Sequence, residues 1–507
     1  MAATRTGRSI ITLVTGMAGT VVTVLAGLAA TPLILRGLGD ERYGIFRAAS
    51  DWLMYLGLLE LGLGGALRAL FARALAQDDP TQVATVLRAG QRAYLRVMII
   101  SMVVGTGLAV VLPTLVQVPD DWTGEFRFGV GIAVAGLALL PLAAYRPLAE
   151  ASQRGYLVHL AITVQALTTA GCAVVFANLS WGLPGQFLAT VLGTLAGAVL
   201  VTVDGYRRLS VAGTSDPTPI EKELRSQSRP MLFFDLAGRL SLFTDNILIA
   251  GLLGPASVAS FALSQRLIAA AGAQAGALGV AAWAGLIDLH YRGAHEQFAR
   301  RLAQLTRLTS LLGLALLVPV AVANHEAIAL WVGSERYAGP VVTWLAAGNA
   351  WALAVLSAWG WPLNASGRVA VVLPSMLTGT AVNLIVSITA TATIGLPGPL
   401  LGTAAAFLFV SWWWLLKLLR QHFQTRSGIL LGAALRPVLI AIPYTVGLLL
   451  LVEWLPILDP ARPLAERWLS LALFGGIAAI VFLGLGWFTA LTSEDRAEWR
   501  ARRGGTP

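Results

Sequence analysis

The chain has 507 residues, of which 56% are hydrophobic and only 12% are charged. With a mean hydropathy of +0.72, this composition lies outside the range of soluble globular proteins and indicates an integral membrane protein. The net charge of +10 is spread over short basic clusters between apolar runs, which argues against nucleic acid as a partner. The only cysteine, Cys172, lies in an apolar run, so disulfides and thiolate metal sites are excluded.

Apolar runs bounded by charged residues, glycine or proline predict fourteen membrane helices. In chain order they are residues 9–35, 43–72, 86–113, 127–150, 155–177, 183–206, 229–252, 255–288, 296–323, 338–361, 368–393, 398–420, 430–452 and 468–491. The first segment is too long for the apolar region of a signal peptide, so we interpret it as an uncleaved spanning helix. The predicted fold class is an all-α integral membrane protein.

The most polar internal stretch, residues 207–228, follows the sixth predicted helix and is interpreted as a cytoplasmic linker. It divides the chain into a six-helix bundle at 1–206, a second at 229–422, two further helices at 423–491 and a tail at 492–507. When alternate loops are assigned to opposite sides, most of the 36 lysines and arginines fall on the side that holds both termini. The positive-inside rule therefore predicts that both termini are cytoplasmic.

Charged residues inside the predicted helices are the first site candidates, because a charge facing lipid costs about 3 kcal/mol on insertion scales. Arg47 and Asp51 are i,i+4 neighbours on one face of the helix predicted at 43–72, whereas Glu60 would lie nearly opposite Asp51. Arg47 and Asp51 can line a cavity together or can simply neutralise each other. Both interpretations remain open from the sequence.

The helix predicted at 229–252 has a short polar stripe of Asp235, Arg239 and Asn246, with Asp245 to one side. Asp235 has Arg239 as a possible intrahelical partner, but Asp245 has no basic residue one turn away. We therefore expect Asp245 to be the first choice for coupling to a Na⁺ or H⁺ gradient, with Asp235 and Asn246 as further members of that site.

Arg239 and Arg266 are predicted close to the membrane midplane. At 1.5 Å rise per residue, Arg239 lies roughly 14 Å from the inner end of its helix, and Arg266 roughly 17 Å from the outer end of the next. Arg47 lies in the outer third. Guanidinium groups bind phosphate through two parallel hydrogen bonds, so Arg47, Arg239 and Arg266 are the predicted phosphate contacts. Asp51 is assigned to the same substrate site, where it would moderate the charge of Arg47.

Enzymatic interpretations find little support in the sequence. The five histidines form no metal-binding pattern, and no nucleophile elbow, Walker A loop or dinucleotide-binding glycine motif is present. The loops predicted outside are short, unlike the long external loops expected of membrane glycosyltransferases or glycan polymerases. We therefore expect a non-enzymatic membrane protein without a cofactor.

The segment TPLILRGLGDERYGIFRAASDWLMYLGLLELGLGGALRALFARALAQDD, residues 31–79, resembles the first-hairpin signature of the Wzx-type flippases, the polysaccharide-transporter branch of the MOP exporter superfamily. In that signature a P-x-x-x-R-x-L-G-x-x-x-Y-G run precedes a helix ending in L-[DE]-L-G-L-G. LWVGSERYAGPVVTWLAAG and the stretch beginning PLNASGRVAVV resemble the ninth to twelfth helices of the same family. The similarity covers residues 9–420.

This resemblance implies two six-helix bundles that form a V around a cationic cavity and alternate between inward-open and outward-open states. The implied substrate is a polyprenyl-diphosphate-linked oligosaccharide that moves from the inner to the outer leaflet of the cell membrane. Membrane lipids, glycosyltransferases or a glycan polymerase are the implied partners. Lys222 and Lys417 are the only lysines, so arginine would have to recognise the phosphate. Two alternatives remain open: a drug/cation antiporter of the same superfamily, and a non-transporting scaffold of a glycan-assembly complex.

Overall fold

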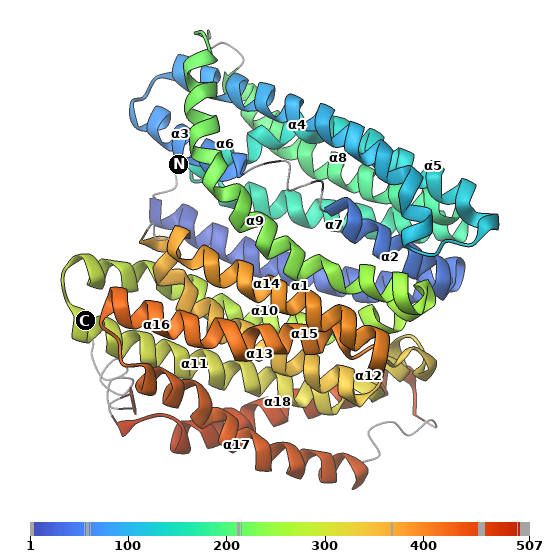
Figure 1. Ribbon diagram of the computed structural model, residues 1–507, viewed down its shortest axis with the longest axis vertical. Coiled ribbons are helices and arrows are strands. Elements are labelled where there is room, and N and C mark those ends of the chain that lie inside the picture. The colour runs from blue at the N-terminus through green and yellow to red at the C-terminus, as the bar shows by residue number, and fades with distance from the viewer. Residues whose placement is uncertain are drawn as a thin grey trace. The chain divides into compact units, whose positions relative to one another are not determined.

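The computed structural model describes residues 5–54, 56, 60, 62–209, 213, 215–366, 369–454, 462–493, 495 and 496. Side chains are described for these residues except at 5–10, 13, 14, 208, 227–243, 278–285, 364, 365, 369, 370 and 453. Regular structure in the described residues is helical (Figure 1). In chain order the elements are α1 (Arg5–Leu38), α2 (Asp40–Met54), α3 (Leu63–Ala76), α4 (Pro80–Leu115), α5 (Asp120–Gly136), the 3-10 helix η2 (Leu137–Ala144), α6 (Tyr145–Ala151), α7 (Gly155–Asn178), α8 (Gly182–Leu209), α9 (Thr218–Leu253), α10 (Pro255–Tyr291), α11 (His295–Val322), α12 (Asn324–Trp331), η3 (Ser334–Arg336), α13 (Pro340–Ala365), α14 (Val369–Ile394), α15 (Gly398–Ala406), the π-helical η4 (Phe407–Ser411), α16 (Trp412–Phe423), α17 (Ser427–Trp454) and α18 (Leu464–Thr489).

Within the described residues, eleven helical segments are long and apolar enough to cross a membrane. The prediction of an all-helical, multi-pass membrane protein is therefore confirmed. The three remaining predicted segments coincide with α2 and α3, with α9 and with α10. These are also the segments that contain the charged site candidates, and the total of fourteen spanning helices stays a prediction.

The second predicted helix is wrong as a continuous element. α2 ends at Met54 and α3 begins at Leu63, after Gly62, whose φ of 70° lies in the left-handed region. Four glycines between residues 57 and 65 lower the helix propensity of this stretch, and Gly62 adopts the left-handed conformation at little steric cost. Glu60 therefore lies between the two helices, and the predicted opposition of Glu60 and Asp51 on one helix does not exist.

The predicted linker at 207–228 is also wrong in its second half, because α9 already begins at Thr218. Charged residues in this first part of α9 form ion pairs with α3 and α4 instead of facing only water. Glu221 lies 2.5 Å from Arg96 and 3.6 Å from Arg92, and Glu223 lies 2.8 Å from Arg73. The polarity that suggested a loop in the sequence belongs to a helix whose charges have partners.

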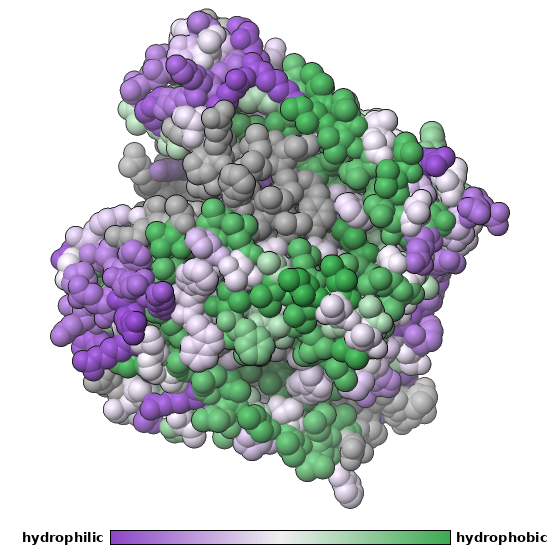
Figure 2. Space-filling model, viewed as in Figure 1, coloured by the Kyte–Doolittle hydropathy of each residue, from purple (hydrophilic) through white to green (hydrophobic). Residues whose placement is uncertain are grey.

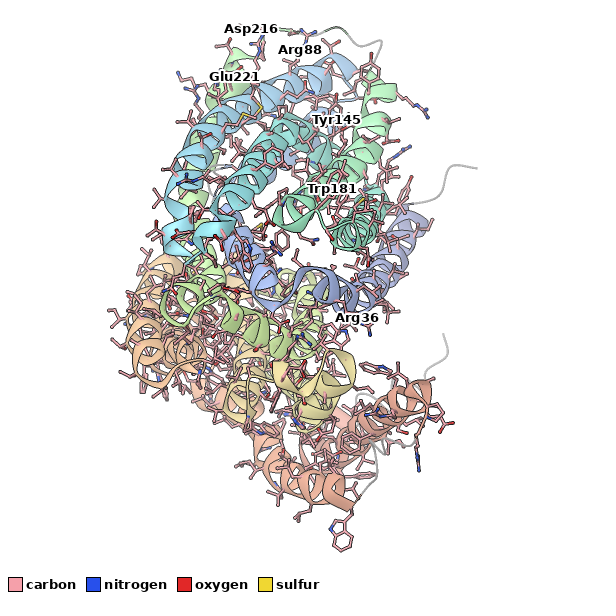
Figure 3. The ribbon with its side chains drawn as sticks, turned by 90° about the vertical axis from the view of Figure 1, so that its right-hand side faces the viewer. Arg36, Arg88, Tyr145, Trp181, Asp216 and Glu221 are labelled. Atoms are coloured by element: carbon pink, nitrogen blue, oxygen red, sulfur yellow. The ribbon has the colours of Figure 1, made fainter. Side chains whose placement is uncertain are left out.

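Asp216 precedes α9 and helps to define where this helix starts. Its carboxylate accepts hydrogen bonds from the backbone nitrogen and the hydroxyl of Thr218, at 3.0 and 2.7 Å, and these bonds hold the pKa of Asp216 below its usual value. Figure 3 shows Asp216 together with Arg88 of α4 and Glu221 of α9 at one end of these helices. The linker and its ion pairs therefore lie together at one end of α4 and α9.

The chain divides into two compact units, residues 1–259 and residues 260–507. In the first unit, α7 lies between α1 and α8, and α4 contacts α3, α5, η2 and α9. A cluster of buried apolar residues from α3, α4, α6 and α8 forms its core, with Phe71 and Leu67 fully buried. α2 and α9 also contact each other. The sequence predicts two six-helix bundles, at residues 1–206 and 229–422, and this division of the chain stays a prediction.

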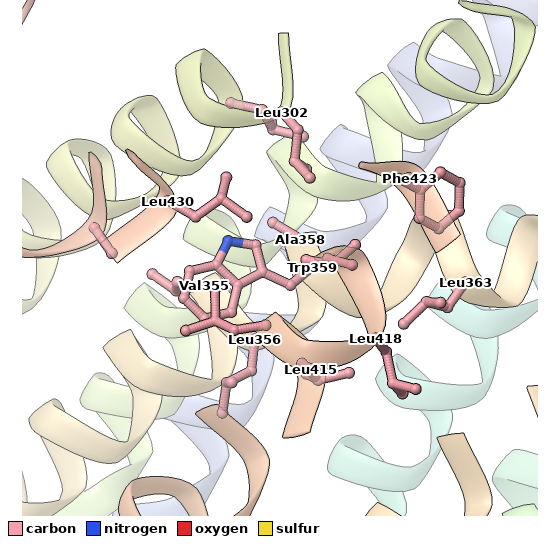
Figure 4. Packing of buried hydrophobic residues seen from close by; sticks show 14 of the residues in the cluster. Leu302, Val355, Leu356, Ala358, Trp359, Leu363, Leu415, Leu418, Phe423 and Leu430 are labelled. Atoms are coloured by element: carbon pink, nitrogen blue, oxygen red, sulfur yellow. The ribbon is translucent and has the colours of Figure 1, made fainter. Parts of the chain in front are cut away.

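In the second unit α11 is the central element and contacts α13, α17 and α18. Its core surrounds Trp359, whose indole nitrogen donates a 2.9 Å hydrogen bond to the Thr306 hydroxyl, and includes Leu302, Phe423 and Leu430 (Figure 4). The two helices that follow residue 423 thus pack against α11. In Figure 2 hydrophobic residues cover much of the visible sides of the helices, and hydrophilic residues gather near helix ends.

Candidate functional site

Two glycines of the quoted first-hairpin signature position α2. Gly39 has a φ of 80° and ends α1, and its carbonyl accepts a 3.1 Å hydrogen bond from the Tyr43 backbone nitrogen at the start of α2. At Gly44, a β-carbon would lie 1.8 Å from the carbonyl oxygen of Pro255, the first residue of α10. Only a residue without a side chain fits there. α2 is thereby packed directly against the turn that ends α9.

The first turn of α2 is fixed by a set of contacts around Glu125 of α5. One carboxylate oxygen of Glu125 lies 3.1 Å from the Arg42 guanidinium, and the other accepts a 2.6 Å hydrogen bond from the Leu183 backbone nitrogen at the start of α8. The Arg42 guanidinium also lies 4.4 Å from the ring centroid of Trp122. We name Arg42, Trp122, Glu125 and Leu183 the α2 anchor. Sequence reasoning assigned no role to Arg42, although it lies in the GLGDERYG run.

Two turns further along α2, a second polar set joins α2 to α9. Asp51 is buried, with 7% of its surface exposed, and its carboxylate accepts a 2.6 Å hydrogen bond from the Asn246 side-chain amide. Asp245 neighbours Asn246, and its negative charge repels that of Asp51. One carboxylate oxygen of Asp245 and the amide oxygen of Asn246 are buried and have no hydrogen-bond partner within the described part of the chain. Asp51, Asp245 and Asn246 form what we call the α2–α9 acidic cluster.

Arg47 lies one turn before Asp51 on α2, and its charge acts on the Asp51 carboxylate. The two side chains nevertheless form no ion pair, and none joins Arg47 to any other carboxylate in the described part of the chain. The Arg47 Nε is buried without a hydrogen-bond partner. The interpretation of Arg47 and Asp51 as a simple neutralised pair is therefore wrong, because the direct partner of Asp51 is Asn246.

The acidic cluster is deep along both helices. Asp51 lies about 17 Å from the start of α2 at Asp40, and Asp245 about 12 Å from the end of α9 at Leu253, at 1.5 Å rise per residue. The contact of Gly44 with Pro255 shows that these two helix ends are adjacent. In a hydrocarbon core about 30 Å thick, these depths are close to the middle.

The composition of the cluster suits a small cation or a proton. Two carboxylates and an amide oxygen are the hard oxygen ligands that alkali and alkaline-earth cations prefer, and either carboxylate can instead take up a proton. Buried polar oxygens normally have hydrogen-bond partners, so oxygens without one indicate places where a ligand can bind. The geometry unites residues that the sequence assigned separately, Asp51 to the substrate and Asp245 with Asn246 to ion coupling.

The remaining predicted site residues are Asp235, Arg239 and Arg266. Asp235 and Arg239 lie in the helical backbone of α9, but their side chains are outside the described ones. Arg266 lies on α10 in the second unit, is partly exposed, and forms no ion pair with any carboxylate among the described residues. Its neighbours Ser264 and Ile268 are buried.

No protein-family model and no curated protein matches the chain. Among solved structures, it is similar to the lipid II flippase MurJ in an inward-closed conformation, with a TM-score of 0.69 and 11% identity over 93% of this chain and 98% of MurJ. It is also similar to an inward-facing multidrug resistance MATE family transporter of the MOP superfamily, with a TM-score of 0.63 and 14% identity over 80% of this chain and 98% of that one. A mutant of the Vibrio cholerae MATE transporter VcmN is similar with a TM-score of 0.55 and 18% identity over 82% of this chain and 98% of that one.

At these identities the similarity establishes the fold. The chain has the fold of MOP-superfamily transporters and flippases, and these structural neighbours are transporters rather than enzymes. The resemblance to this superfamily in the sequence is confirmed at that level. The assignment to its polysaccharide branch and the identity of the substrate are matters for proposal.

Proposed function

We propose that the chain is a flippase that moves a polyprenyl-diphosphate-linked oligosaccharide from the inner to the outer leaflet of the cell membrane by alternating access. The fold of MOP transporters supports transport as the activity. The quoted first-hairpin signature supports the polysaccharide branch. Glycosyltransferases that build the oligosaccharide and a polymerase that uses it are the expected partners in the membrane.

The position of Arg266 is the observation that supports an anionic substrate. It lies about 17 Å along α10 from Pro255, close to the middle of a bilayer. A guanidinium at that depth is costly unless it faces water, protein or an anionic ligand, and Arg266 has no carboxylate partner among the described residues. A diphosphate offers such a group the two parallel hydrogen bonds that it binds best. Arg47 and Arg239 are proposed as further phosphate contacts.

We propose that the α2–α9 acidic cluster couples transport to a gradient of Na⁺ or H⁺. Asp245 has a buried oxygen without a hydrogen-bond partner, and Asp51 is held by a single neutral donor, Asn246. A bound cation or proton would satisfy these oxygens and remove the repulsion between the two carboxylates. Asp235 is proposed as an additional member of the cluster.

A drug/cation antiporter is the second candidate, and the acidic cluster itself favours it. Two carboxylates close together near the middle of a membrane would attract an organic cation as readily as a metal ion. Two of the similar solved structures are MATE transporters, one of them described as a multidrug resistance protein. Arg266 argues against this candidate, because a substrate pathway with a permanent positive charge on its wall would repel a cationic substrate.

The decisive experiment is flipping of a polyprenyl-diphosphate-linked oligosaccharide by purified protein in vesicles, followed by enzymatic access to the sugar from the opposite side. We expect Arg266→Ala to abolish flipping. Arg266→Lys keeps the charge but loses the paired hydrogen bonds, so flipping should fall roughly 10–100-fold, the value of one or two hydrogen bonds to a charged group.

Arg420→Gln is the matched control, because Arg420 is an exposed arginine at the end of α16 and loses the same charge without affecting Arg266. It should flip the substrate at the rate of the unmodified protein. The amount of folded protein in the vesicles is measured in parallel for every variant. Undiminished flipping by an Arg239→Ala, Arg266→Ala double variant would contradict the phosphate assignment, and uptake of a cationic dye without any flipping would favour the antiporter.

A further inference from the structure

The second unit contains a cavity of about 1140 Å³ at the ends of several helices. It is lined by the first three turns of α11, the segment between α16 and α17, the start of α17 and the segment after α18. Four arginines line it: Arg300, Arg301, Arg307 and Arg426. The acidic side chains on its wall are Glu296 and Asp495. The cavity therefore has an excess of fixed positive charge.

Three lining residues have a buried polar atom that lacks a hydrogen-bond partner among the residues that the structure describes. These atoms are the His295 Nδ1, the Arg307 Nε and the Thr425 hydroxyl. Thr425 is only 2% exposed, and the Arg307 side chain is only 9% exposed. Because buried polar groups in proteins almost always have partners, three such atoms around one cavity indicate the position of a polar ligand. All three can donate a hydrogen bond, His295 in one of its tautomers, so the expected ligand is an acceptor.

One of the four arginines is already partly neutralised by a carboxylate. Asp495, in the segment after α18, forms an ion pair with a terminal nitrogen of Arg307, and it also accepts a 3.0 Å hydrogen bond from the Thr492 backbone nitrogen. Arg300 and Arg426 are exposed and form no ion pair with a carboxylate among the described residues. Two permanent charges on the wall thus remain available to an anion.

The cavity lies where the second unit would meet the membrane surface. α11, α17 and α18 are each long and apolar enough to span a membrane, and the cavity is lined by the first turns of α11 and α17 and by residues just beyond the end of α18. Ile429 on the first turn of α17 also lines it and is 51% exposed. Further along the same helix, exposed apolar residues continue through Leu439, Ile442 and Val446. An acyl chain can therefore lie along α17 while its headgroup occupies the cavity.

We propose that this cavity binds the phosphate headgroup of an anionic phospholipid from the leaflet on the side where α11 begins and α18 ends. Arg300 and Arg426 bind the phosphate, the buried Arg307 and Thr425 donate to it from the inner wall, and the acyl chains lie along α17. Asp495 opposes binding, because its carboxylate already pairs with Arg307. The residues that line the cavity include neither Arg266 nor any member of the acidic cluster, so binding can be tested without knowing the transported substrate.

The hydrophobic core of the second unit keeps this site in place. Ala303 and Leu430 line the cavity and also belong to the core around Trp359. Figure 4 shows Leu430 and Leu302 beside Trp359 within that core. The arginines therefore project from helices whose other faces are firmly packed, and the positions of the charges should be largely formed before a lipid arrives.

The test measures binding to the purified full-length protein in a neutral detergent, by thermal shift and by native mass spectrometry. Three probes are compared: dioctanoyl phosphatidylglycerol, dioctanoyl phosphatidylcholine and glycerol 3-phosphate. We expect saturable binding of phosphatidylglycerol and much weaker binding of phosphatidylcholine. If glycerol 3-phosphate and phosphatidylglycerol bound equally well, the proposal of a lipid ligand would be wrong. The cavity would then be a site for a soluble phosphate compound.

The decisive variant is Arg300→Gln together with Arg426→Gln. Both side chains are exposed, so folding should be unaffected, and binding of phosphatidylglycerol should weaken roughly 30-fold, because each basic residue near an anionic lipid contributes a factor of about five. Lys417→Gln with Arg420→Gln is the matched control: it removes two exposed charges from α16 outside the cavity and should bind as the unmodified protein does.

Asp495→Asn supplies a change of opposite sign. Removing the carboxylate frees Arg307, so phosphatidylglycerol should bind several-fold more tightly than to the unmodified protein. If phosphatidylglycerol binding weakened equally in the cavity variant and in the α16 control, only the overall charge of the protein would matter. That result would contradict the proposed lipid site. The same conclusion would follow if phosphatidylglycerol and phosphatidylcholine bound equally well.

Discussion

The two polar regions of α2 differ in how completely their carboxylates are satisfied. In the α2 anchor, both oxygens of Glu125 have partners, the Arg42 guanidinium and the Leu183 backbone nitrogen. In the α2–α9 acidic cluster, an oxygen of Asp245 is buried without a partner among the described residues, and the hydrogen-bond donor to Asp51 is the neutral amide of Asn246. A charge within a membrane protein is therefore no site by itself. What distinguishes the acidic cluster is a buried carboxylate oxygen that has no hydrogen-bond partner among the described residues.

The physical consequences of the two arrangements are opposite. Glu125 neutralises Arg42 and accepts from the first turn of α8, where the helix dipole also favours a negative charge, so it stabilises the fold. In the acidic cluster the negative charges of Asp51 and Asp245 repel each other, and Arg47, one turn from Asp51, only partly offsets this repulsion, so a bound cation or proton would stabilise the region. Mutations can therefore distinguish the α2 anchor, which stabilises the fold, from the acidic cluster, which is suited to bind a ligand.

The largest effect is expected from Asp245→Asn. Losing this charge should remove the dependence of transport on a Na⁺ or H⁺ gradient, which for coupled sites is a factor of roughly 5–150. The thermal stability should stay unchanged or rise, because a buried charge without a partner is replaced by a neutral amide. The measurement is transport in vesicles under imposed gradients of each ion, with the melting temperature of each protein recorded beside it.

Asp245→Ala separates charge from oxygen ligation, because it also removes the side-chain oxygens that a cation would use. If Na⁺ is the coupling ion, Asp245→Ala should bind it more weakly than Asp245→Asn. If a proton is coupled, the two variants should behave alike. If Asp245→Asn transported normally and still depended on the gradient, the acidic cluster would not be the coupling site, and it would not differ in function from the α2 anchor.

A smaller effect of the opposite kind is expected from Glu125→Gln in the anchor. Replacing the carboxylate weakens the contact with Arg42 and the cap on α8, and the loss should be about 1–2 kcal/mol of unfolding free energy. The expected observation is a lower melting temperature in detergent, with an unchanged transport rate per folded molecule. A lost gradient dependence in Glu125→Gln, at normal stability, would mean that the anchor takes part in coupling.

The sequence predicted the helices well because membrane spans are defined by length and apolar composition, which are local properties. It also predicted that Arg47, Asp51, Asp245 and Asn246 belong to a site, because charge in such segments is costly, and that assignment stays a prediction. The hydrogen bond between Asp51 and Asn246 joins residues 195 positions apart, and no periodicity within one helix reveals such a contact.

The predictions from sequence were wrong or incomplete where a local sequence pattern reflects contacts between distant parts of the chain. Residues 218–228 looked like a linker because they are charged, yet Glu221 and Glu223 find arginine partners on α4 and α3 and the segment is helical. Gly44 looked like part of a motif, and only the structure shows that it allows the contact with Pro255. The role of Glu125 was equally hidden, since its partners come from two other elements.

The last prediction concerns the side of the membrane on which the α2 anchor lies, and its variants should have the smallest effect on activity. Gly124 precedes Glu125 and is exposed, with space for a side chain, and Ser215 is exposed in the segment before α9. In a Cys172→Ala background, Gly124→Cys should react with a membrane-impermeant maleimide on intact cells, because the positive-inside rule places the anchor outside. Ser215→Cys should react only after the cells are permeabilised. Both variants should transport normally, since neither residue belongs to the acidic cluster. Reaction of Ser215→Cys in intact cells would invert the topology, so that the anchor would face the cytoplasm and the lipid-headgroup cavity the outer leaflet.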